Sequence, residues 1–363
     1  MRSTPTSPVG ATRGIHIVNR TARSVLKESN MRTSTSLLLC SLVAACAQVG
    51  ERGGTQAGPD AGGTAAAACD DLETITGDLT ITGASGFTDL PQGCWELTGK
   101  LTLRGPAVMS LDKLGDLRTV AGLELDSTAL TGVDTPSAID VTGDVMIHHN
   151  AQLVDLGHVQ PHGELTTLDL EYNDSLAIIG GLSQVTRVTG ATTISDNGKL
   201  STLDLSHATR LEGGLTISDN GALTTVKLDQ LSSVGPLTLR HNALLSSISS
   251  LASLQYVHGT LTIDDNDNLG SLSAMSGAMT SIDGSILVTG NAQLASLGQL
   301  THVGVVGGSV SITSNGNLDY CEPQPFTCCT QITGTLQISG NESSQCQQHS
   351  WCWSNNDGCP FQN

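Results

Sequence analysis

The sequence predicts an all-β fold, a parallel β-helix or leucine-rich solenoid of about twelve 22–26-residue coils with disulfide-linked caps. A phrase of alternating aliphatic residues recurs at even spacing, and the cysteines gather at both ends of the repeats. The composition agrees, because the 363 residues are 38% hydrophobic but only 2% aromatic. An aliphatic core without rings suits a regular stack better than an ordinary enzyme domain, where aromatic side chains fill irregular gaps.

The recurring phrase carries two aliphatic residues separated by one polar residue. Residues 259–272 (GTLTIDDNDNLGSL) align without a gap to residues 213–226 (GGLTISDNGALTTV). This alternation places both aliphatic side chains on one face of a short strand, which gains a core only by stacking on its equivalents in neighbouring coils. The second aliphatic recurs every 22 to 26 residues, at Ile81, Leu103, Leu125, Ile147, Leu170, Ile194, Ile217, Leu239, Ile263, Val288, Ile312 and Ile338.

Each phrase ends at a predicted corner. An Asn lies three residues after the second aliphatic in the last nine copies, and its side chain can satisfy backbone groups at a turn while its backbone tolerates the left-handed region. Stacked coils would therefore form an Asn ladder of Asn150, Asn173, Asn197, Asn220, Asn242, Asn266, Asn291, Asn315 and Asn341. A Gly two residues before the first aliphatic fits a tight bend with no room for a side chain, at Gly143, Gly213, Gly259, Gly284, Gly308 and Gly334.

The N-terminal residues predict export. Residues 1–30 are polar and basic and are interpreted as a non-native extension, with Met31 as the start in preference to Met1. Residues 31–45 have the layout of a signal peptide, and the last residues before Cys46 resemble a lipobox, which implies a diacylated Cys46. The alternatives are an ordinary cleaved signal and a chance apolar run. Residues 46–68 are a Gly/Ala-rich flexible linker, so we expect a lipid-anchored protein of the cell envelope, in the outer membrane.

Eight cysteines remain after Cys40 in the signal and Cys46 are set aside, and an even number in an exported chain favours disulfides. We predict a Cys69–Cys94 bridge in an N-terminal cap and first coil at residues 69–98. The C-terminal cap, residues 321–363, leaves its pairing open, and a zinc site using Cys328, Cys329 or His349 is the alternative. Its six cysteines are Cys321, Cys328, Cys329, Cys346, Cys352 and Cys359.

The phrase resembles the receptor L domain, the leucine-rich β-helix module of insulin- and EGF-receptor ectodomains, over roughly residues 75–345 of the body at 69–363. The resemblance implies a right-handed helix and a binding function. The resemblance assigns no ligand-contact residue to this sequence, and the sequence has no kinase region like that of the receptors. Leu follows the Asn by three residues in every copy from Asn150 to Asn315, whereas in an ordinary leucine-rich repeat it follows by two, and this difference argues against a horseshoe with outer helices.

The outward positions offer weak candidates for chemistry. Glu124, Asp126, His148, Asp169 and Glu171 would lie on three neighbouring coils as possible acid/base groups, but solvated surface residues explain them better. Calcium at Asp264, Asp265 and Asp267 is a further hypothesis, weighed against ordinary turn chemistry. A Thr/Ser wall resembles ice-binding solenoids, although strand propensity explains it equally well.

The formal net charge of −18 argues against binding nucleic acid or an anionic membrane surface. We therefore predict a non-enzymatic surface lipoprotein that recognises a protein or cell-surface polymer with its solenoid wall. It would have no cofactor and would touch the membrane through its lipid only. The alternatives are a purely structural envelope protein and a β-helix enzyme that acts on polysaccharides.

Overall fold

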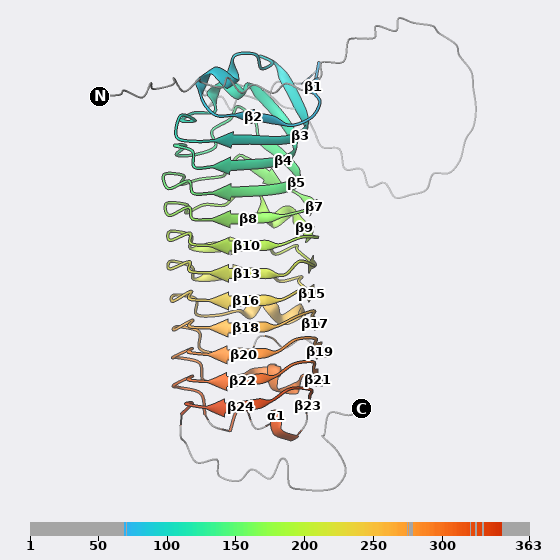
Figure 1. Cartoon of the computed structure of the whole chain (residues 1–363), viewed down its shortest axis with the longest axis vertical. Helices are drawn as coiled ribbons and strands as arrows, with labels where there is room; N and C mark the ends of the chain where they lie inside the picture. The colour runs from blue at the N-terminus through green and yellow to red at the C-terminus, as the bar shows by residue number, and fades with distance from the viewer. Residues whose placement is uncertain are drawn as a thin grey trace, which may run out of the picture.

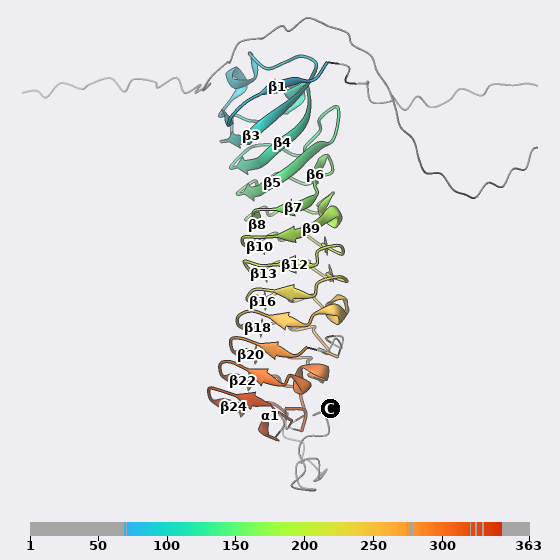
Figure 2. The same ribbon diagram turned by 90° about the vertical axis from the view of Figure 1, so that its right-hand side faces the viewer.

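The computed structural model describes residues 69, 71–273, 275, 279–319, 321–323, 325–328 and 330–342. The described strands stack in a single long column of coils (Figures 1 and 2). The coils wind in a right-handed sense, and every pairing between strands is parallel. The predicted β-solenoid is thus confirmed, and almost no helix is present in the described part.

The main wall of the column is a 14-stranded sheet. Twelve of its strands hold the second aliphatic residues of the phrase, so about eleven full turns connect the first to the last. Its strands are β1 (Glu73–Ile75), β2 (Leu79–Ile81), β3 (Cys94–Arg104), β4 (Asp116–Asp126), β5 (Ile139–His148), β6 (Val159–Pro161), β8 (Leu168–Glu171), β10 (Thr192–Ser195), β13 (Leu215–Ser218), β16 (Leu237–Arg240), β18 (Leu261–Asp264), β20 (Ile286–Thr289), β22 (Val310–Thr313) and β24 (Leu336–Ser339).

A second wall is formed by the aliphatic steps between phrases, which build an eight-stranded sheet. Its strands are β7 (Gly163–Leu165), β9 (Val185–Val188), β12 (Arg210–Leu211), β15 (Ser233–Val234), β17 (Tyr256–Val257), β19 (Ser281–Ile282), β21 (Val305–Val306) and β23 (Gln331–Ile332). The remaining elements are the pair β11 (Thr202–Asp204) and β14 (Thr225–Lys227), the 3-10 turns η1 (Ala84–Phe87), η2 (Asp112–Leu114), η3 (Leu182–Gln184), η4 (Ser249–Ser253) and η5 (Gly298–His302), and the short helix α1 (Pro325–Cys328).

The core is one continuous strip of aliphatic side chains between these walls. The second aliphatic residue of every phrase from Ile81 to Ile312 is at most 1% exposed. Equivalent residues of the second sheet, from Leu165 to Val306, are buried to the same extent. Burial of this kind contributes about 25 cal/mol per Å² of apolar surface, so each coil is stabilised mainly by the two coils on which it stacks.

The Asn side chains lie in one column inside the corner that follows the main sheet. Those from Asn150 to Asn315 are completely buried, whereas Asn341 is partly exposed. Asn266 is representative: its Nδ2 donates to the carbonyl of Leu239 in the preceding coil at 2.9 Å, and its Oδ1 accepts the backbone N–H of Asn242 at 3.2 Å. Thr128 occupies the ladder position in an early coil and donates its hydroxyl to Asn150 Oδ1 at 2.7 Å.

The left-handed backbone at this corner belongs to the residue before the Asn, which differs from the expectation that the Asn itself would adopt it. Non-glycine residues with φ between 50° and 59° occupy this position before seven of the nine ladder Asn residues and before Thr128, and Gly290 and Gly340 occupy it before the other two Asn residues. The ladder Asn itself therefore does not adopt the left-handed conformation. The eight residues are Ser127, His149, Tyr172, Asp196, Asp219, His241, Asp265 and Ser314.

Glycines of successive coils stack directly on one another at the bend before the main sheet. A Cβ at Gly284 would lie 2.6 Å from the backbone carbon of Gly259, and one at Gly213 would lie 2.2 Å from that of Gly190. Distances this short are absent from real structures, so the predicted bend accepts no side chain at these positions.

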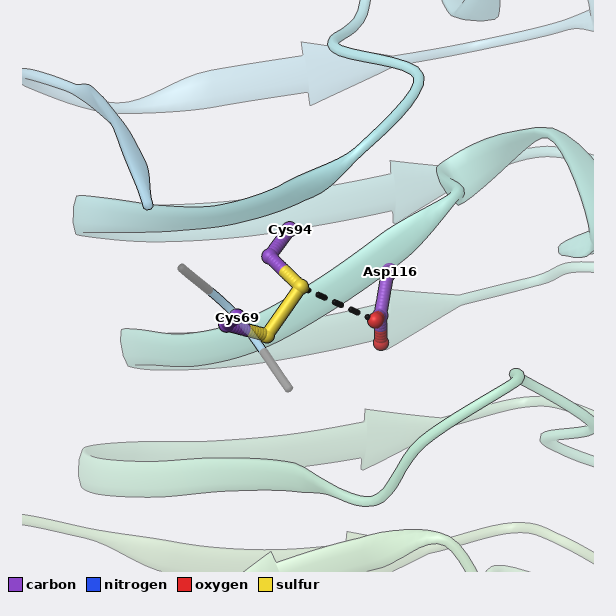
Figure 3. A group of neighbouring side chains, drawn as sticks. All are labelled: Cys69, Cys94 and Asp116. Carbon is purple, nitrogen blue, oxygen red and sulfur yellow. Dashed lines mark hydrogen bonds between the residues drawn. A yellow bond between two sulfur atoms is a disulfide. The ribbon is translucent and has the colours of Figure 1, made fainter. Parts of the chain in front are cut away.

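The N-terminal cap contains the predicted Cys69–Cys94 disulfide, with a Cα–Cα distance of 5.7 Å. Figure 3 shows Asp116 against it, with Oδ2 3.1 Å from Cys94 Sγ. Because a disulfide sulfur carries no proton and is no thiolate, this contact is neither an ordinary hydrogen bond nor part of a metal site. Trp95, completely buried beneath the cap, donates to the carbonyl of Leu114 at 2.6 Å.

At the other end, Cys321 is also disulfide-bonded. The remaining C-terminal calls, which are the pairing or zinc binding of Cys328, Cys329, Cys346, Cys352, Cys359 and His349, fall outside the described side chains. The same holds for the extension, signal peptide, Cys46 and linker at residues 1–68.

Candidate functional site

The outward face of the main sheet carries two columns of polar side chains, because strand residues alternate between core and surface. The first column contains the register neighbours Glu124, Met146 and Asp169. The second column contains the register neighbours Asp126, His148 and Glu171. The five predicted acid/base residues therefore do lie on three adjacent coils. Their electrostatic partners nevertheless divide them into two groups.

The first group is an ion-pair network around Glu124. Lys100 Nζ lies 3.0 Å from one carboxylate oxygen of Glu124, and Arg104 lies 2.6 Å from the other. Burial, which by itself raises the pKa of Glu124, is outweighed by these two cations, and the pKa falls below its ordinary value. Arg104 also pairs with Asp126 at 2.8 Å. Glu124, whose ionised form these cations stabilise, is a poor candidate for acid/base catalysis, and Asp126 is engaged by the same arginine.

The second group is His148, Asp169 and Glu171. His148 Nε2 lies 3.1 Å from Asp169 Oδ2, and one ligand-type atom from each of the three residues falls within 4.8 Å of the others. The Asp169 carboxylate raises the pKa of His148 above its ordinary value, burial opposes the rise, and Glu171 and Asp126 add to it. Asp169 Oδ1 is buried and makes no hydrogen bond within the described structure, whereas the buried His148 Nε2 faces the other oxygen of that carboxylate.

The predicted calcium run is only partly assembled. Asp264 lies 3.3 Å from Arg240, and Asp265 lies 3.3 Å from His241 Nε2. His241 also contacts Asp219 through Nδ1 at 2.9 Å, so the imidazole bridges two carboxylates in neighbouring coils. Asp267 does not join this group. The run is thus engaged with basic side chains, an arrangement that differs from the all-oxygen shell that calcium prefers.

A hollow of 370 Å³ lies on the other wall, over the eight-stranded sheet. It forms because Ser233 lies in register between two large residues, Arg210 in the preceding coil and Tyr256 in the following one. Two coil steps separate these larger side chains by about 9.6 Å, and the small Ser leaves the space between them open. The lining residues are Arg210, Ser232, Ser233, Gln255, Tyr256 and His258.

The groups around the hollow are available for a ligand. Arg210 makes no ion pair or hydrogen bond with any residue that the structure describes, whereas Arg187, one coil earlier, lies 3.0 Å from Glu164 and 2.7 Å from Glu212. The Tyr256 side chain is 41% exposed, and its ring stacks on His258 with centroids 6.0 Å apart. His258 is held in turn by Asp283 at 3.0 Å.

Sequence reasoning missed this hollow. The polar residues that flank the second aliphatic suggested sites on the main sheet alone, and the segments between the phrases were interpreted only as aliphatic steps. A signal was present, because Arg210 and Tyr256 each immediately precede the aliphatic residue of their short strand. Aligning that position across coils would have placed them on one face.

The fold makes this chain a β-solenoid protein with a polar hollow on one wall and a charged cluster on the other. No protein-family model, curated protein or solved structure matches it. Within the described residues, no helix has the length and apolar character needed to cross a membrane.

Proposed function

We propose that the chain is a non-enzymatic binding protein of the cell envelope, anchored in the outer membrane by a lipid on Cys46, whose solenoid wall recognises a surface polymer. The observation that carries the proposal is the hollow between Arg210 and Tyr256. The similarity of the coil phrase to receptor L domains supports recognition as the class of function.

The chemistry of the hollow favours a polysaccharide bearing carboxylate groups. The guanidinium of Arg210 can form two parallel hydrogen bonds with a carboxylate. The exposed ring of Tyr256 offers a flat apolar face to a sugar, and Ser233 and Gln255 supply hydroxyl and amide groups for its hydroxyls. Among the residues that the structure describes, Arg210 has no acidic partner although the chain carries a net charge of −18, so its guanidinium is available to a carboxylate of a ligand.

Two alternatives compete with this proposal. A purely structural envelope protein would have no use for an unpaired cation beside an exposed ring. An enzyme acting on polysaccharides would need free acid and base groups, and the ion pairs that occupy Glu124 and Asp126 weigh against the predicted cluster in that role.

The test is binding of the purified protein to immobilised polygalacturonate, with a neutral glucan in parallel. We expect saturable binding to the acidic polymer that weakens at least about tenfold in Arg210→Ala, since a charge-assisted bidentate contact is lost. Tyr256→Ala should weaken binding to both polymers.

Arg240→Ala is the matched control, because it removes an exposed Arg from the other wall and should leave binding unchanged. Absence of saturable binding to either polymer would favour the structural alternative. Cleavage of the polymer that disappears in Asp169→Asn would favour the enzyme.

A further inference from the structure

We propose that His148, Asp169 and Glu171 bind one zinc ion on the outer face of the main sheet. The three side chains come from two adjacent strands, β5 and β8, in which His148 and Glu171 are partners in register. Asp169 lies two residues before Glu171 and projects from the same face. This site is on a different wall from the Arg210 hollow and does not depend on the function proposed for it.

The spacing of the ligand atoms fits zinc. With bond lengths of about 2.0 Å, two ligand atoms of a tetrahedral zinc ion lie about 3.3 Å apart. His148 Nε2 and Asp169 Oδ2 are already 3.1 Å apart, and Glu171 offers an oxygen within 4.8 Å of both. The third bond requires this Glu171 oxygen to move closer to the other two ligand atoms.

The unmet bonding capacity of the cluster points to a ligand. Asp169 Oδ1 is shielded from solvent and makes no hydrogen bond to any described residue, while His148 Nε2, also shielded, has the Asp169 carboxylate as its neighbour through Oδ2. A buried polar atom without a partner is costly, so the free oxygen of Asp169 indicates that the cluster can take a further ligand. A zinc ion bound to the imidazole nitrogen and to the Asp169 carboxylate is such a ligand.

The donor set selects zinc over calcium. An imidazole nitrogen together with two carboxylates is a common donor set for zinc, whereas calcium takes six to eight oxygens. Ser195 Oγ donates to Glu171 Oε1 at 3.1 Å, which orients that carboxylate from the next coil as an outer-shell contact. Three protein ligands leave the fourth position of the ion to water or to a donor atom of a partner.

The experiment is a calorimetric titration of the purified, EDTA-treated and desalted protein with zinc chloride, with bound metal counted after dialysis. After dialysis, the His148→Gln variant should retain one equivalent of zinc less than the wild type. In the titration, its affinity for zinc at that site should be at least about tenfold lower. Asp169→Asn should behave likewise. Cobalt(II) should give the visible absorption bands of a four-coordinate ion in the wild type and lose them in His148→Gln.

His241→Gln is the matched control, because His241 stands beside Asp264 and Asp265 in the other His–carboxylate group of this wall. The His241→Gln variant should still bind one equivalent of zinc at the proposed site. Circular dichroism in EDTA checks folding, and Glu171→Gln, which leaves the His148–Asp169 ion pair intact, carries the test if His148→Gln does not fold. The proposal is overturned if the wild type binds no zinc, if neither His148→Gln nor Glu171→Gln loses an equivalent, or if His241→Gln loses it instead.

Discussion

Replacing Asn266 by alanine is expected to lower the free energy of unfolding by about 4 kcal/mol. The substitution leaves the buried backbone N–H of Asn242 without its partner and removes one donor each from the carbonyls of Leu239 and Asp264, the second of which still accepts the N–H of His241. A buried group without a partner costs about 1–3 kcal/mol, and each lost hydrogen bond costs about 0.5–1.5 kcal/mol. The measurement is urea-induced unfolding followed by far-ultraviolet circular dichroism.

Asn268→Ala is the control for this prediction. Asn268 lies two residues further along the same corner, but its side chain is exposed, and the change should shift stability by less than about 0.5 kcal/mol. Equal losses in the two variants would mean that the Asn column contributes nothing beyond ordinary turn preference.

Gly284→Ala should also destabilise the solenoid strongly, by roughly 3 kcal/mol. The added methyl group would lie 2.6 Å from backbone atoms of both Gly259 and Thr260, and a backbone cannot rotate aside as a side chain can. The same bend is packed in the neighbouring coils, so the displacement would spread along the stack. The shift in the urea midpoint measures the effect.

Gly270→Ala provides the comparison, because a Cβ at that position meets nothing within 4 Å. We expect its urea midpoint to stay close to that of the wild type. If Gly284→Ala were equally mild, the glycine bend would have space that the structure does not show, and the close stacking of coils at that corner would be wrong.

The fold was predictable because one short-range rule repeats. Alternating aliphatic residues such as Leu261 and Ile263 specify a buried face within each strand, and their recurrence specifies which strands are neighbours. The left-handed residue was assigned to the Asn when it is the residue before, as with Asp265 before Asn266. Both residue types tolerate that backbone, so composition alone could not separate the two positions.

The candidate sites were less predictable, because they depend on side chains meeting across coils. The register placed His148 beside Glu171 and diagonally from Asp169, but the grouping of Glu124 with Lys100 and Arg104 required the directions of long, flexible side chains. The Arg210 hollow arises from a small residue between two large ones in successive coils, which no single repeat reveals.

Both sites and the Asn column require that equivalent residues of successive coils lie side by side, and engineered disulfides measure this most directly. Thr216 and Thr238 are register partners in adjacent coils, whereas Thr262 is one coil further along. Adjacent strands are about 4.8 Å apart, within disulfide range, and two steps exceed it. The register predicts that Thr216→Cys with Thr238→Cys forms a disulfide detected by peptide mass spectrometry and that Thr216→Cys with Thr262→Cys does not. Bonding in the second pair alone, or in neither, would contradict the stacking of these coils.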